Sequence, residues 1–286
     1  MSAARGTLYV VATPIGNLGD VTLRAIEVLK AVPLVAAEDT RLTRRLFSRH
    51  GIGTRLVSYH ARSAPAREAE LLAHLRLGDD LALVTDAGTP GVSDPGEGLV
   101  AAWAAEGGAA VPIPGASAVL AAVAASGVTG PRWAFEGFLP RSGRERRERL
   151  ARIAADDRGT VLFEAPGRIA ATLRDLAAAC GGERRSAVCR ELTKIHETIV
   201  RGTLDELAAA ARDGAIPARG EFVLVVGGVA GSGRVPAADD EAAVDQARAD
   251  VERLVGEGIA RGEAARRVGA ATGIPRRHLY GASRDR

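Results

Sequence analysis

The chain has 286 residues, of which 47% are hydrophobic and 26% are charged, and its formal net charge is +3. This length suggests two domains, since one domain usually takes roughly 100–200 residues, and the composition excludes a disordered or fibrous protein. The sequence has no long uncharged apolar run, no apolar segment of a secretory signal near its start, and two cysteines, so we expect a cytoplasmic protein without a membrane span or a disulfide scaffold.

The first part of the chain alternates short apolar runs with amphipathic stretches. This pattern predicts strands at 7–12, 33–37, 81–85 and 109–113, and helices at 21–31, 41–50, 65–77 and 98–106, with Asp20 as the N-cap of the first helix. Strands that alternate with helices are typical of a parallel sheet with helices on its faces. We therefore predict a first α/β domain over residues 1–115.

A second series of elements follows. The pattern predicts strands at 133–138, 160–163, 186–190, 197–201 and 221–226, and helices at 169–179 and 204–212. The Gly/Pro/Ala-rich stretch at 227–238 indicates a linker. Two further helices are predicted at 241–257 and 262–272. We therefore assign residues 116–228 to a second α/β domain, 229–240 to a linker and 241–286 to a basic helical tail.

Three loops that follow predicted strands are rich in polar side chains, and two of them, 12–20 and 85–96, are also rich in glycine and proline. They span residues 12–20, 38–41 and 85–96. Loops at the carboxyl ends of strands are where open α/β sheets bind ligands. None of them has the GxGxxG pattern or the lysine of a nucleotide triphosphate loop, so neither kind of nucleotide site is indicated. Each loop also has a purely structural interpretation, as a strand-to-helix turn with an N-cap.

One lysine and two arginine-rich segments are candidates for binding phosphate groups. Lys194, one of two lysines in the chain, lies in a segment that joins two predicted strands, where it could bind a phosphate or lower the pKa of a nearby hydroxyl. Arginines concentrate at 141–152 and 261–286, a footprint suited to phosphates unless these side chains are simply solvated. The five histidines lack metal-ligand spacing, so no metal is predicted.

Residues 10–20 (VVATPIGNLGD) resemble the opening signature of the ribosomal small subunit methyltransferase I family, the bacterial rRNA (cytidine-2′-O)-methyltransferases of the tetrapyrrole-methylase superfamily. Further segments match that family in the same order: 38–41 (EDTR), 86–90 (DAGTP), 93–96 (SDPG), 135–140 (FEGFLP) and 190–194 (RELTK). The resemblance covers about residues 6–228.

The resemblance implies two α/β domains of the tetrapyrrole-methylase type with S-adenosylmethionine in the cleft between them, a small helical C-terminal extension and a homodimer. It also implies which residues contact the methyl donor: Pro14, Asp86, Ala87, Gly88, Val92 and Ser93 from the first domain, Ser117 and Ala118 at the hinge, and Glu164, Leu192 and Gly220 from the second domain. The implied reaction methylates a cytidine ribose 2′-hydroxyl in the decoding region of 16S rRNA.

A ribose hydroxyl is a poor nucleophile until its proton is removed or its oxyanion is stabilised. We expect Asp39 or Asp94 to accept the proton, and Lys194 or Arg41 to stabilise charge or hold a phosphate. One alternative is methylation of a small tetrapyrrole-like acceptor, although that class opens with Gly-x-Gly-Pro-Gly-Asp where this chain has Thr-Pro-Ile-Gly-Asn at 13–17. Another is a non-catalytic rRNA-binding factor.

Overall fold

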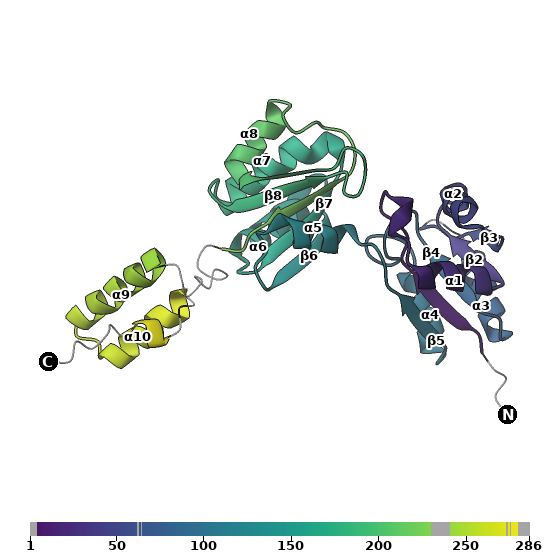
Figure 1. Cartoon of the computed structure of the whole chain (residues 1–286), viewed down its shortest axis with the longest axis horizontal. Coiled ribbons are helices and arrows are strands. Elements are labelled where there is room, and N and C mark those ends of the chain that lie inside the picture. Colours follow the sequence, from purple (N-terminus) through teal and green to yellow (C-terminus); the bar gives the residue numbers. More distant parts are fainter. Residues whose placement is uncertain are drawn as a thin grey trace. The chain divides into compact units, whose positions relative to one another are not determined.

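The structure is a computed structural model, which describes residues 5–61, 63, 65–229, 241–272, 274 and 276–279 (Figure 1). The chain divides by its contacts into two compact units, Met1–Ala122 with Glu191–Thr198, and Val123–Arg190 with Ile199–Arg286. The short segment Glu191–Thr198 therefore packs with the first unit although it follows much of the second in sequence. The domain limits given above stay a prediction, and residues 230–240 of the predicted linker lie outside the described residues.

The first unit contains a parallel five-stranded sheet with the order β3-β2-β4-β1-β5. Its strands are β1 (Thr7–Val11), β2 (Leu34–Ala37), β3 (Arg55–Ser58), β4 (Leu81–Val84) and β5 (Ala109–Ile113). Its helices are α1 (Leu23–Ala31), α2 (Thr40–His50), α3 (Pro65–Arg76) and α4 (Glu97–Ala105), and α5 (Ala118–Ser126) spans the boundary of the two units.

Alternate residues of the central strand β4 enter two different apolar clusters. Leu81 and Leu83 pack with leucines of α3 and with Trp103 of α4. Ala82 and Val84 pack with α1 and α2. Because successive side chains of a strand point to opposite faces, both faces of this sheet are covered by helices. This explains why the strand is an unbroken apolar run, and the predicted parallel α/β arrangement is confirmed.

Three details of the first unit differ from the prediction. The N-cap of α1 is Thr22, whose hydroxyl accepts the Ala25 N–H at 3.1 Å, whereas Asp20 belongs to a 3-10 turn before it. Strand β3 was not predicted, because its four residues include two apolar ones and lie at a partly exposed edge. Helix α5 was not predicted either, because it is apolar on every side and shows no amphipathic period.

The second unit is built on a mixed sheet with the order β6-β7-β10-β8-β9. Strands β6 (Trp133–Phe138) and β7 (Gly159–Glu164) are parallel, and β10 (Phe222–Val226) is antiparallel to both β7 and β8 (Arg185–Arg190). Strand β9 (Thr198–Thr203) leads into helix α8 (Leu204–Arg212) through a capping box between Thr203 and Glu206. Helices α6 (Gly143–Ala155) and α7 (Ile169–Cys180) also belong to this unit. The sequence did not predict α6, because its many charged residues obscure the apolar period.

The C-terminal residues form three helices, α9 (Glu241–Gly256), α10 (Arg261–Thr272) and α11 (Arg276–Leu279). Their buried side chains make one apolar cluster that includes Val251, Ala264, Val268 and Leu279. The two predicted helices are confirmed, and the short third helix closes their core. None of the helices in the described part of the chain is long and apolar enough to cross a membrane.

Candidate active site

The loops after β1 and β4 are joined directly by hydrogen bonds. The Thr13 N–H donates to the Gly88 carbonyl at 2.8 Å, and the Gly88 N–H donates to the Thr13 carbonyl at 3.0 Å. The Thr13 hydroxyl also donates to the Thr85 carbonyl at 3.0 Å. Pro14 and Gly88 are buried by this contact, while Asp86 and Ala87 remain exposed beside it. Two of the predicted ligand loops therefore form one surface.

A second set of hydrogen bonds ties in the loop after β2. The Asp39 N–H donates to the Asp86 carboxylate at 2.9 Å, and the Asp86 N–H donates to the Glu38 carboxylate at 3.3 Å. Partial burial raises the pKa of Glu38 and of Asp86, and the negative charges of their neighbours add to this effect. All three predicted loops thus meet at the carboxyl ends of β1, β2 and β4.

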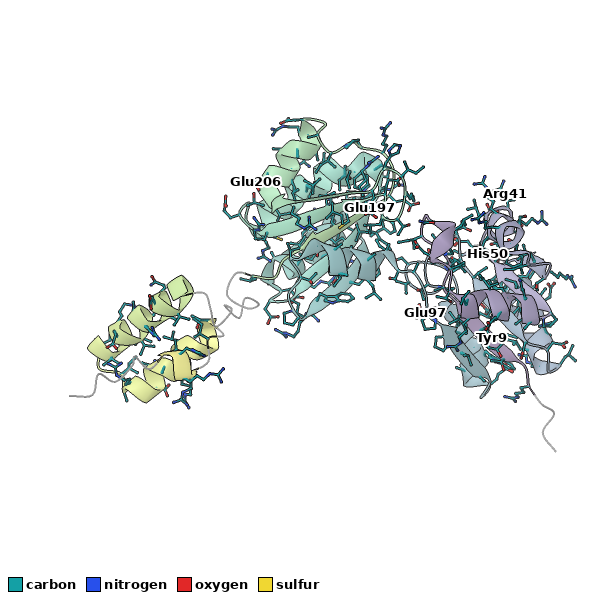
Figure 2. All side chains as sticks on the ribbon, viewed as in Figure 1. Tyr9, Arg41, His50, Glu97, Glu197 and Glu206 are labelled. Carbon is teal, nitrogen blue, oxygen red and sulfur yellow. The ribbon has the colours of Figure 1, made fainter. Side chains whose placement is uncertain are left out.

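Asp39 and Arg41 form a two-point ion pair at the start of α2. Arg41 donates from Nε and from one terminal nitrogen to the two carboxylate oxygens of Asp39, at 3.1 and 2.7 Å. The side-chain hydrogen bonds from Arg41 lower the pKa of Asp39 to about 2. The Arg41 side chain, on α2 (Figure 2), is 85% exposed. A carboxylate held in this way is a weak base.

Asp94 has the opposite environment. It is half-buried, and desolvation, together with the charges of Glu38 and Asp86, raises its pKa to about 6, an effect that the Thr85 hydroxyl partly offsets. Asp94 lines a cavity of about 440 Å³ that also contains Tyr59, His60 and Glu68. The Tyr59 hydroxyl donates to Glu68 at 2.8 Å. Sequence analysis did not select Tyr59 or Glu68, since neither belongs to a Gly-rich loop.

Backbone strain marks two of the loops. Among the described residues, three non-glycine residues have a left-handed backbone: Ser93, with φ 65°, Glu191, with φ 52°, and Thr193, with φ 66°. Such conformations cost free energy and concentrate at functional sites. The amino group of Lys194 lies 2.9 Å from the Glu191 carboxylate, and the Thr193 N–H donates to Glu197 at 2.6 Å. The segment 191–198 is thus held in a defined shape.

Gly16, in the loop after β1, lies against the segment 191–198. A Cβ atom at Gly16 would be 2.5 Å from Cγ of Lys194 and 2.9 Å from the Thr193 hydroxyl oxygen. The absence of a side chain at Gly16 thus allows the Lys194 side chain to approach the loop after β1.

We predict that Gly16→Ala displaces the segment 191–198. We expect the free energy of unfolding to fall by about 1–3 kcal/mol, and the methylation rate to fall about tenfold, which is roughly 1.4 kcal/mol. Gly53→Ala is the matched control, because a Cβ there meets no atom within 4 Å. Urea unfolding and single-turnover kinetics measure both effects. Equal results for the two variants would contradict the role given to this contact.

The other residues predicted to contact the methyl donor belong partly to the first unit and partly to the second. Val92 is 37% exposed and Ser93 is exposed, as a ligand-contacting position requires. Ser117 and Ala118 lie half-buried at the start of α5. Gly220, with φ 88°, precedes β10 in the second unit. Leu192 was expected from the second domain, but it is buried within the segment that packs with the first unit.

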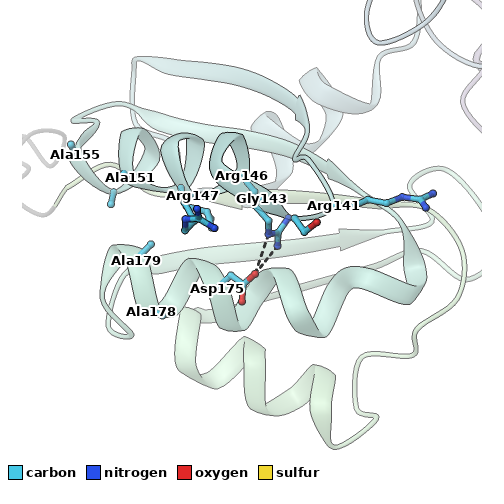
Figure 3. A pocket seen from close by; sticks show the side chains of 12 residues that line it. Arg141, Gly143, Arg146, Arg147, Ala151, Ala155, Asp175, Ala178 and Ala179 are labelled. Atoms are coloured by element: carbon cyan, nitrogen blue, oxygen red, sulfur yellow. Dashed lines mark hydrogen bonds and ion pairs between the residues drawn. The ribbon is translucent and has the colours of Figure 1, made fainter.

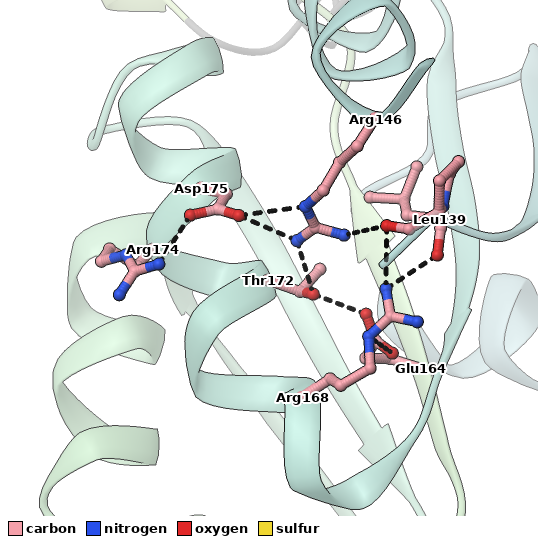
Figure 4. Close-up of polar contacts among 8 residues, drawn as sticks. Leu139, Arg146, Glu164, Arg168, Thr172, Arg174 and Asp175 are labelled. Atoms are coloured by element: carbon pink, nitrogen blue, oxygen red, sulfur yellow. Dashed lines mark hydrogen bonds and ion pairs between the residues drawn. The ribbon is translucent and has the colours of Figure 1, made fainter. Parts of the chain in front are cut away.

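Glu164 takes part in a polar network inside the second unit (Figure 4). It is 3% exposed. One carboxylate oxygen accepts the Ala165 N–H at 2.7 Å and pairs with Arg168 at 3.2 Å. The other accepts the Thr172 hydroxyl at 2.5 Å. Its side chain is therefore already occupied at the end of β7. In the described ranges no group of three or more His, Cys, Asp or Glu side chains could hold a metal ion.

Comparison with known proteins identifies the family. Residues 7–208 match the model of the tetrapyrrole (corrin/porphyrin) methylases. A Synechocystis protein named "Ribosomal RNA small subunit methyltransferase I" is 46% identical over 96% of both chains, and a Bacillus subtilis protein of the same name is 39% identical over 97% of this chain and 94% of its own. The chain belongs to this methyltransferase family. It is an S-adenosylmethionine-dependent methyltransferase, which confirms the predicted family, enzyme class and methyl donor.

Solved structures support the fold of this methyltransferase. A cobalt precorrin-4 methyltransferase matches with a TM-score of 0.58 at 19% identity, over 77% of this chain and 94% of its own. A uroporphyrin-III C-methyl transferase from Thermus thermophilus, complexed with S-adenyl homocysteine, matches with a TM-score of 0.56 at 20% identity, over 78% and 98% of the two chains. The predicted tetrapyrrole-methylase fold is confirmed.

Proposed function

We propose that this methyltransferase transfers a methyl group from S-adenosylmethionine to the ribose 2′-hydroxyl of a cytidine in the decoding region of 16S rRNA. The supporting observation is the similarity over 96% of both chains to a relative named for the small subunit rRNA. A ribosomal substrate fits a cytoplasmic enzyme, and we propose a homodimer as its working form.

The test is transfer of a tritiated methyl group to 30S subunits that lack the modification, followed by mapping of the labelled nucleotide. We expect one labelled cytidine, with the label on its ribose. Label on a base, or transfer to a small tetrapyrrole in place of the subunit, would overturn the proposal. Calorimetry with S-adenosylmethionine addresses the remaining alternative, since a factor that acts only as a scaffold would not bind the donor.

The surface formed by the three loops suits the methyl donor. We assign the donor contacts to Pro14, Val92, Ser93 and the segment 86–88. The exposed carboxylate of Asp86 can accept hydrogen bonds from ribose hydroxyls or offset a positive charge, and Ala87 and Gly88 leave room beside it. S-adenosylmethionine supplies an electrophilic methyl group on a positively charged sulfur. Glu164 of the second unit was also predicted to contact the methyl donor, but its carboxylate already accepts hydrogen bonds from the Ala165 N–H and the Thr172 hydroxyl.

The protein's part in the chemistry is to orient the hydroxyl in line with the methyl group, to exclude water and to accept a proton. Asp94 is the better of the two candidate proton acceptors. Its pKa is raised to about 6, so it can take up a proton near neutral pH, whereas Arg41 lowers the pKa of Asp39 to about 2 and makes it a weak base. We assign Lys194 to charge stabilisation, since it is partly buried in the strained segment. The exposed Arg41 suits a substrate phosphate.

The basic tail is a candidate for a separate rRNA-binding surface. Several of its arginines are paired with carboxylates, among them Arg261 with Glu252 and Arg267 with Glu263, so fewer of its positive charges remain unpaired for phosphates. We predict that truncation after Gly228 weakens rRNA binding and lowers the slope of log K against log salt by about 1 for each phosphate that the tail neutralises. Filter binding at several salt concentrations measures this slope. A slope that does not change would exclude the tail as a major phosphate-binding element.

A further inference from the structure

A groove of about 880 Å³ lies between α6 and α7 in the second unit (Figure 3). None of the candidate donor-binding or catalytic residues lines it. Most of its lining is small and apolar, with five alanines and one leucine: Ala151, Ala154, Ala155, Ala178, Ala179 and Leu150. Helix α6 has 13 residues, which gives it a length of about 20 Å. This is too long for one small anion and suits an extended chain.

The charge of this groove is positive. Three arginines line it against one acidic residue, Asp175. Arg146 is buried and already pairs with Asp175 at 2.9 Å, so its charge is largely compensated within the protein. The outward positive charge therefore comes from Arg141 and Arg147.

Arg141 and Arg147 differ from Arg144 and Arg149 of the same segment. Arg144 pairs with Glu148 at 2.6 Å and Arg149 pairs with Glu145 at 3.2 Å, each one helical turn away. No acidic side chain in the described part of the chain pairs with Arg141 or Arg147. Figure 3 shows Arg147 pointing into the space between the two helices and Arg141 extending beyond the start of α6.

We propose that the groove between α6 and α7 binds the ribose-phosphate backbone of the rRNA substrate through Arg141 and Arg147. The alanines allow a backbone to lie close to both helices, and the two guanidiniums provide cations for successive phosphates. Such contacts position an RNA without reading its sequence. The proposal rests on the proposed rRNA substrate and adds to it a site away from the three loops.

The experiment compares the double variant Arg141→Ala/Arg147→Ala with the control Arg144→Ala, in the full-length chain. The control removes one exposed arginine of the same helix that is already paired with a glutamate. Binding of free 16S rRNA and of whole 30S subunits is measured at several salt concentrations, and S-adenosylmethionine binding is measured by calorimetry. For the double variant we expect about tenfold weaker rRNA binding at low salt and a salt slope lower by about 1.4–1.8, which corresponds to two phosphates. We expect the control to bind like the wild type.

Two outcomes would overturn the proposal. The first is rRNA binding by the double variant that equals the wild type in strength and in slope. The second is unchanged binding of free rRNA combined with weaker binding of whole 30S subunits, which would assign the groove to an acidic protein surface. Donor affinity that stays at the wild-type value shows that the variant is folded. Failure of the proposed function would appear elsewhere, as a wild-type enzyme that binds rRNA but leaves its riboses unlabelled.

Discussion

Asp94→Asn is expected to slow methyl transfer by about 10²–10⁴-fold, the usual contribution of a positioned general base. The amide keeps the size of the carboxyl group but cannot accept the hydroxyl proton. Single-turnover methylation of 30S subunits measures the step, and calorimetry with S-adenosylmethionine confirms that the donor still binds. Because desolvation and the charges of Glu38 and Asp86 disfavour an ionised Asp94, the variant should be no less stable than the wild type at pH 8.

The pH dependence provides a second readout. A general base must be ionised, so the wild-type rate should rise with pH through about 6, the pKa to which burial raises Asp94, and level off about one unit above it. In the Asn variant this rise should be absent. Asp39→Asn is the matched control, because the pKa of Asp39 is lowered to about 2 by Arg41 and its ionisation is complete throughout this range. A wild-type rise that persists in Asp94→Asn, or a larger loss in Asp39→Asn, would reverse the assignment.

Arg146→Ala is expected to lower the free energy of unfolding by about 3 kcal/mol, the lower end of the usual cost of removing one partner of a buried ion pair, because the Asp175 side chain is 27% exposed and also pairs with Arg174. Arg146 is 7% exposed. Its guanidinium donates to Asp175, to the Thr172 hydroxyl at 3.0 Å and to the Pro140 carbonyl at 2.9 Å. Through Thr172 the network reaches Glu164 (Figure 4). The substitution therefore removes one donor from each of these acceptors, although Asp175 keeps a hydrogen bond from Arg174 at 3.0 Å and the Pro140 carbonyl keeps one from Arg168 at 3.3 Å.

Urea unfolding measures this destabilisation. Arg144→Ala, on the same helix, removes an exposed pair and should cost about 1 kcal/mol or less. Replacing both members of the buried pair, as Arg146→Met/Asp175→Leu, should recover part of the stability, since apolar side chains of similar size often replace a buried pair at little cost. If Arg146→Ala and Arg144→Ala were equally stable, the network would not hold α6 on α7.

Part of this fold follows from local patterns. The alternation of apolar strands with helices predicted a parallel sheet, and its strands β2 and β4 are buried throughout, as expected for strands covered on both faces. The elements that escaped prediction lack such a pattern. Strand β3 is partly exposed, α5 is apolar on every side and α6 carries alternating charges. In each of them, packing by distant residues stabilises a structure that the local sequence leaves open.

The sequence by itself determined the alternation of strands and helices, the Gly- and Pro-rich loops at the strand ends and the likeness to an rRNA methyltransferase family. It could not choose between Asp39 and Asp94, because each is an aspartate in a polar loop. The tertiary structure supplies the difference on which our assignment of Asp94 rests, since a pKa depends on burial and on charges that distant segments supply. Tertiary structure alone also brought Lys194 to Gly16, some 180 residues away in sequence. Contacts over such separations depend on how the whole chain packs, so they cannot be predicted from the local sequence pattern.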